Sequence, residues 1–145
     1  MAHIMNMDRC VNPRPVTFVN SVAGLERGLF LEIVGMAANN VFGGGADDFE
    51  AYKVKLATAA TKVGDLVINT TVPKQYDERL EEKDFVMAEG AMGRAHYITT
   101  GDEYTLPKDF VANVTAVGDE VELAANGKLA KKTNGTAIGE VVRIY

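Results

Sequence analysis

The alternation of apolar and polar residues along the chain predicts short β-strands. Residues 52–56 (Y-K-V-K-L) place their apolar side chains on one face and their lysines on the other, which is typical of a half-buried strand. Residues 120–123 (E-V-E-L) alternate in the same way. By contrast, residues 28–34 (G-L-F-L-E-I-V) form a nearly continuous apolar run, which predicts a strand buried on both faces over part of its length.

Turn residues separate these runs at roughly even intervals. Asn126-Gly127 and Asn134-Gly135 are two-residue hairpin signals. Further short strands are predicted at 66–68, 95–99, 104–106, 128–130 and 138–145. Short strands with regular turns predict a mainly β fold, namely a small β-barrel, a β-tulip-like domain or a sandwich.

Two internal segments depart from this pattern. Residues 74–85 (K-Q-Y-D-E-R-L-E-E-K-D-F) predict one short helix, because they are rich in helix formers and place Tyr76 and Leu80 on one face. Gly43, Gly44 and Gly45 predict a loop, since consecutive glycines hold no regular element.

The N-terminal segment has the character of an extended arm. Pro13 and Pro15, in N-P-R-P-V, cannot donate ladder hydrogen bonds and favour extended neighbours. We therefore expect residues 1–20 to form an arm that docks on a partner or on the edge of its own sheet, and residues 21–145 to form a single β-rich domain. The methionines near the start leave Met5 and Met7 as alternative natural initiators.

One heptapeptide occurs nearly twice. T-K-V-G-D-L-V begins at Thr61 and T-A-V-G-D-E-V begins at Thr115, with every match in one register. One interpretation is a recurring Gly-Asp turn. The other is that two similar turn-strand units frame one barrel, with the valine after each turn pointing inward. Both interpretations make the repeated residues turn and core residues rather than chemical groups.

Composition narrows the function classes. The net charge of −5 and the pI near 5.0 disfavour nucleic-acid binding, which requires a basic field. No apolar run approaches the length of about 18 residues that a membrane helix needs. Cys10 is the sole cysteine, so no intramolecular disulfide can form and folding in a reducing cytoplasm is the simplest expectation.

The sequence offers few candidates for catalytic side chains. His96 is the first candidate for a catalytic or ligand-binding group, with Arg94, Tyr97 and Asp102 nearby in the sequence. Cysteine and histidine spacings do not fit zinc, and the acidic stretches do not follow the calcium-loop pattern. We therefore expect no cofactor, no metal and no enzymatic activity.

The C-terminal third contains an ordered series of segments: Y-T-L-P at 104–107, V-T-A-V-G-D-E-V at 114–121, N-G-K-L at 126–129 and N-G-T-A-I-G at 134–139. This series resembles the capsid decoration (cement) proteins of tailed bacteriophages and prophages. The resemblance covers residues 100–145, with weaker echoes at 61–68. It rests on turns and strands rather than on a catalytic motif, and residues 1–45 and 74–85 have no counterpart in it.

The resemblance implies a structural virion protein that binds the outer surface of an expanded phage capsid and stabilises it. It implies synthesis in the host cytoplasm, a place on the capsid surface, and the major capsid protein as partner, with monomer and homotrimer both open. The arm would make the contact, by strand addition at residues 16–19. The expected capsid-binding residues are Pro13, Arg14, Pro15, Val16, Phe18 and Val19.

Two alternatives stay open at this stage. The first is another virion component, such as a head fibre or a tail module, with the same barrel. The second is a small ligand-binding β-barrel or enzyme with its site near His96.

Overall fold

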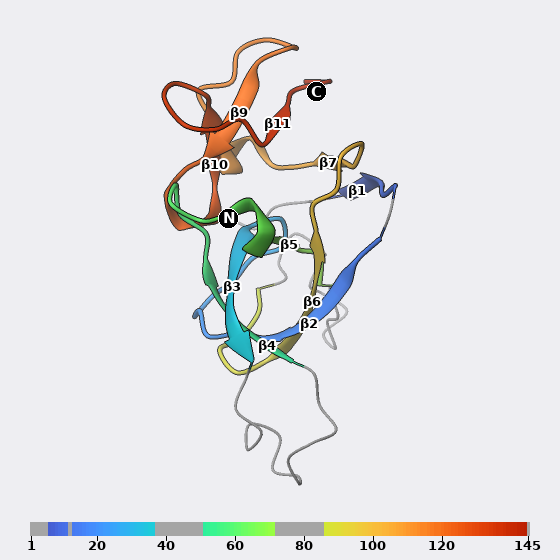
Figure 1. Ribbon diagram of the computed structural model, residues 1–145, viewed down its shortest axis with the longest axis vertical. Coiled ribbons are helices and arrows are strands. Elements are labelled where there is room, and N and C mark those ends of the chain that lie inside the picture. The colour runs from blue at the N-terminus through green and yellow to red at the C-terminus, as the bar shows by residue number, and fades with distance from the viewer. Residues whose placement is uncertain (1–5, 12, 37–50, 72–85, 145) are drawn as a thin grey trace, which may run out of the picture.

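The computed structural model describes residues 6–11, 13–36, 51–71 and 86–144 (Figure 1). The strands are β1 (Asn6–Arg9), β2 (Pro15–Val19), β3 (Phe30–Met36), β4 (Tyr52–Leu56), β5 (Leu66–Asn69), β6 (Met92–Tyr97), β7 (Glu103–Thr105), β8 (Val111–Ala112), β9 (Glu120–Leu123), β10 (Leu129–Lys131) and β11 (Gly139–Glu140). Within these ranges three single-turn 3-10 helices lie between strands: η2 (Val63–Asp65), η4 (Lys108–Phe110) and η5 (Ala125–Gly127). The prediction of a mainly β fold is confirmed. The predicted helix at 74–85 and the loop at 43–45 lie outside the described residues.

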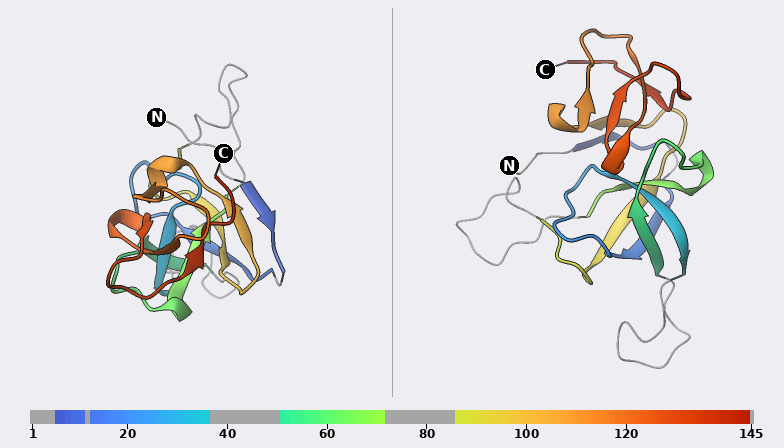
Figure 2. Two further views of the ribbon diagram at one scale, coloured as in Figure 1. Left: turned by 90° about the horizontal axis from the view of Figure 1, so that it is seen from above. Right: turned by 90° about the vertical axis from the view of Figure 1, so that its left-hand side faces the viewer.

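The strands form a closed barrel and two smaller sheets. The barrel has the order β2-β4-β3-β5-β6, and the C-terminal sheet has the order β11-β9-β10-β8. Strands β1 and β7 pair with each other in a separate two-stranded sheet. The C-terminal sheet lies at one end of the barrel, at the top of Figure 1, and the views in Figure 2 show the same arrangement.

Two apolar cores result from this arrangement. The first fills the barrel and contains Phe18, Leu31, Val54, Val67 and Ala95, all with no exposed surface. The second lies between the barrel and the C-terminal sheet. Its buried members are Phe30, Ala57, Leu66, Ile68, Val121, Leu123 and Leu129.

Strands β3 and β5 contribute to both cores. Neighbouring residues of a strand point to opposite faces, so Leu31 packs inside the barrel while Phe30 packs against the C-terminal sheet. In β5, Val67 lies in the barrel core and Ile68 in the second core, and all of β5 is buried. This confirms the prediction of a strand near residues 28–34 that is buried on both faces over part of its length.

The β9–β10 hairpin joins the C-terminal sheet to the barrel at its tip. Asn126 and Gly127 both have positive φ, as the Asn-Gly signal predicts. The Gly127 N–H donates to the Ala57 carbonyl at 2.9 Å. A Cβ on Gly127 would lie 2.4 Å from the carbonyl oxygen of Phe30, so only glycine fits this contact.

The predicted arm over residues 1–20 needs a correction at residues 15–19. This segment is β2, which pairs antiparallel with β6 and parallel with β4 and thereby closes the barrel. Phe18 faces Gly93 of β6, where its ring occupies the space that a side chain at residue 93 would fill. The extended conformation was predicted correctly, but the segment is a strand of the barrel, and Phe18 is fully buried because its side chain helps to fill the barrel core.

The two copies of the repeat lie in different settings. The first precedes β5 of the barrel, and the second precedes β9 of the C-terminal sheet, so the prediction that both frame one barrel is wrong. The valine after each turn is buried, as predicted, but Val67 and Val121 belong to different cores.

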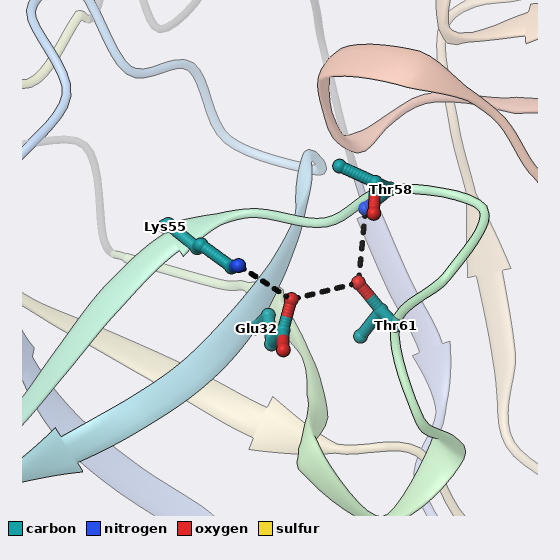
Figure 3. Close-up of polar contacts among 4 residues, drawn as sticks. All are labelled: Glu32, Lys55, Thr58 and Thr61. Atoms are coloured by element: carbon teal, nitrogen blue, oxygen red, sulfur yellow. Dashed lines mark hydrogen bonds and ion pairs between the residues drawn. The ribbon is translucent and has the colours of Figure 1, made fainter.

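The turns themselves also differ. Asp119 accepts hydrogen bonds from the N–H groups of Thr115 and Ala116, and these bonds hold the pKa of its carboxyl below the usual value. In the first copy the ordering group is Thr61, whose hydroxyl accepts from the Thr58 N–H at 2.9 Å (Figure 3). The same hydroxyl donates to Glu32 at 3.0 Å, and Glu32 also pairs with Lys55 at 3.5 Å across the β3–β4 ladder (Figure 3).

A graded series of glycine substitutions tests the hairpin contact. Gly127→Ala combines a left-handed φ with a backbone clash, so we expect a loss of about 2–5 kcal/mol in the free energy of unfolding. Gly118→Ala has a left-handed φ in open space and should lose about 1–2 kcal/mol. Gly64→Ala has neither problem and should change stability little. Urea unfolding measures the three values, and equal losses at residues 127 and 118 would contradict the close contact.

Candidate interaction groove

The structure does not present the predicted capsid-binding residues as one surface. Alternation along β2 turns Val16 and Phe18 toward the barrel core, and Phe18 has no exposed surface. Pro13 and Pro15 are exposed, and the Arg14 guanidinium lies 4.7 Å from the centroid of the Tyr97 ring. Val16 and Phe18 therefore belong to the barrel core, Val19 is partly buried and pairs with Lys53 and Met92, and Pro13, Arg14 and Pro15 stay exposed.

The four residues considered for a site near His96 do not converge. Along β6, Tyr97 packs against the barrel core, so the alternation of the strand directs Arg94 and His96 to its outer face. Asp102 lies in the turn before β7. The structure thus brings Arg94 and His96 onto one face and leaves Tyr97 on the other.

Asp102 is a structural carboxylate. Its Oδ1 accepts from the Val11 N–H at 2.9 Å, and its Oδ2 accepts from the Thr99 N–H at 3.0 Å and from the Tyr104 hydroxyl at 3.4 Å. These bonds tie the segment between β1 and β2 to the turn before β7. Burial raises the pKa of the Tyr104 hydroxyl, and the Asp102 carboxylate raises it further.

Cys10, close to the same carboxylate, has none of the features of an activated thiol. Burial and the Asp102 charge both raise the pKa of the Cys10 thiol. A nucleophilic cysteine needs the opposite environment, in which a neighbouring positive charge favours the thiolate.

The surroundings of His96 lower the pKa of its imidazole. Burial lowers the pKa of the imidazole, the Arg94 charge lowers it further, and the Asp102 charge opposes this. The Nδ1 atom lies 2.6 Å from the Thr70 hydroxyl, which fixes the ring against the residue after β5.

A groove of about 800 Å³ lies beside the C-terminal sheet. Its lining includes three buried residues of the second core, Phe30, Val121 and Leu129. Partly buried apolar residues that pack on this core also line it: Ile98, Tyr104, Leu106, Val111, Val114, Ile138 and Val141. The groove is therefore an outward extension of the second core.

Exposed apolar side chains and carboxylates surround this groove. Val142 and Ile144, after β11, are 58% and 54% exposed. Four acidic residues contribute to the lining, Asp8, Asp102, Glu103 and Glu140, against two basic residues, Lys108 and Arg143. A contiguous apolar surface with a polar margin is typical of a binding site for another molecule.

Sequence reasoning did not find this groove. The predicted closing strand at 138–145 is confirmed only at Gly139–Glu140, and Val142 and Ile144 beyond it stay at the surface. The residues that line the groove include members of β3, β7, β9 and β10 and the C-terminal residues, which are distant in sequence and come together only in the fold.

No family model matches the chain, and neither a curated protein nor a solved structure matches it. Among the described residues, no group of three histidine, cysteine or acidic side chains is placed to hold a metal ion. Within the same ranges, no helix is long and apolar enough to cross a membrane.

The electrostatics of His96 give a testable pH dependence. We expect its imidazole to titrate below 6.5, and Arg94→Gln to raise the pKa toward that value because one repelling charge is removed. In the wild type the folded-state pKa of His96 is lower than that of the unfolded chain, so the unfolded chain binds more protons between the two values. The free energy of unfolding therefore falls as the pH drops from about 6.5 through the folded-state pKa. The proton shift of the ring as a function of pH measures this, with His96→Gln to assign the signal. A wild-type value at or above 6.5 would contradict the environment described.

Proposed function

We propose that the chain is a capsid decoration protein, a structural virion protein that binds the outer surface of a tailed-phage capsid and stabilises it. The observation that carries the proposal is the ordered series of segments between residues 104 and 139. In the structure these segments run continuously from β7 through the β9–β10 hairpin to β11. Three of the four segments lie in or beside the C-terminal sheet, which is one structural unit, whereas Y-T-L-P overlaps β7, which pairs with β1 in a separate sheet.

The surface of that unit supports a role in binding another protein. The groove opens beside β7 and β11, and exposed valine and isoleucine side chains follow β11. Exposed apolar surface of this kind favours association with a partner, because covering it removes apolar area from water. The corresponding partner is the major capsid protein, and both a monomer and a homotrimer are compatible with the proposal.

The proposal gives the stabilisation a simple physical origin. A protein that binds the assembled shell but not its separated subunits shifts the equilibrium toward the shell by mass action. At a free concentration 100 times the Kd, the gain is about 2.7 kcal/mol per site. No catalytic group is needed for this effect.

Co-sedimentation with expanded capsids that lack decoration protein tests the function. We expect saturable pelleting of the full chain with these capsids and a higher capsid melting temperature. Already decorated capsids serve as the control, because their sites are occupied and should bind none. Failure of the chain to pellet with undecorated capsids at any concentration would overturn the proposal.

The full chain is required in that experiment. Removal of residues 1–20 would delete β2 and open the barrel, so lost binding would report unfolding rather than a lost contact. Surface substitutions that leave the barrel intact are the appropriate variants.

A further inference from the structure

Two strand edges border the groove. Within the described part of the chain, β11 is the terminal strand of the C-terminal sheet and β7 pairs with β1 alone. All three residues of β7 and both residues of β11 line the groove. Sheet edges carry backbone donors and acceptors that can pair with a further strand.

The hydrogen bonds around β11 show which of its groups face outward. Val141 donates to the Asp119 carbonyl at 2.9 Å and accepts from the Gly118 N–H at 2.8 Å, so both of its backbone groups point toward β9. Glu140 lies opposite Glu120, whose own carbonyl bonds to Lys132 on the other side. Because backbone groups alternate along an antiparallel strand, the N–H and C=O of Glu140 point away from the sheet.

The groove also fits the side chains of an added strand. A strand has alternating faces, and the apolar lining with Ile138, Val114 and Tyr104 suits apolar residues at every second position. The excess of carboxylates in the lining suits lysine or arginine at the positions between them. The two residues of β11 span about 7 Å at roughly 3.3 Å per residue, which is enough to pair with two or three residues of an added strand.

We propose that this groove receives an extended, basic segment of the capsid subunit, which adds as a strand to the open edge of β11. This inference rests on the proposed function for the identity of the partner. Main-chain hydrogen bonds to Glu140 would give affinity, and the apolar lining with its acidic margin would give specificity. The direction of donation is the reverse of the one expected from sequence, because this chain supplies the receiving edge and not the inserted strand.

Paired substitutions test the groove on intact capsids. Val142→Lys places a positive charge at a 58% exposed position in the groove, and Val117→Lys makes the same change at a 62% exposed position outside its lining. We expect the first to weaken capsid binding by at least about tenfold and the second to leave it within about twofold.

A second pair tests the backbone contact. Glu140→Pro removes an N–H that faces away from β9, so it blocks strand addition and spares the existing sheet. Glu140→Gln removes the same charge and keeps the N–H. We expect the proline variant to lose capsid binding by at least about tenfold and the glutamine variant to lose clearly less. Thermal unfolding of each free variant, matched to the wild type, verifies that the fold is intact.

The outcomes separate the inference from the proposed function. If the wild type pellets and the folded groove variants pellet equally well, the groove inference is overturned and the decoration role stands. If the wild type fails to pellet, the decoration role is overturned and a peptide experiment decides the groove. Its probe is a nine-residue peptide of alternating valine and lysine, with a valine–glutamate peptide as the charge control. Amide shifts confined to β7 and β11 with the lysine peptide alone support the groove, and no shift with either peptide overturns it.

Discussion

The structure depends on two strands that bury side chains on both faces, β5 along its whole length and β3 at its first two residues. Strands β3 and β5 direct Leu31 and Val67 into the barrel and Phe30 and Ile68 against the C-terminal sheet. The two cores therefore lie on opposite sides of the same two strands. Disrupting the packing of one core would also destabilise the other. The contact of Gly127 with the Phe30 carbonyl fixes the hairpin to β3 at a separation that no larger residue permits.

The groove follows from the way in which this second core ends. Its inner part is closed by β9 and β10, whereas the chain after β11 forms no further strand among the described residues. Core side chains consequently continue into an open surface, with the edge of β11 beside them. A strand from another molecule would cover the apolar surface and also pair with the backbone groups at the edge of β11.

Local patterns predicted some of the local elements, but the Asn134-Gly135 signal does not form a hairpin, since β10 and β11 each pair with β9. The alternation at 52–56 gives β4 with the expected bounds, and Asn126-Gly127 gives the expected hairpin. The sequence pattern did not reveal which distant strands pair. The prolines near β2 indicated extended backbone correctly, but the burial of Phe18 depends on Gly93 of β6, far along the chain. The groove escaped prediction for the same reason, because its lining joins residues from β3 to the C-terminal segment.

The position of β2 has a consequence for synthesis. This strand is made early, yet its antiparallel partner β6 ends at Tyr97, which leaves the ribosome roughly 4–16 s later at usual elongation rates. During that interval the barrel cannot close, so Phe18 stays exposed and the apolar segment can pair with strands of other molecules. Pro13 and Pro15 lack the N–H groups that an intruding strand would need. The proline pair is thus placed to act as a gatekeeper against aggregation of the nascent chain.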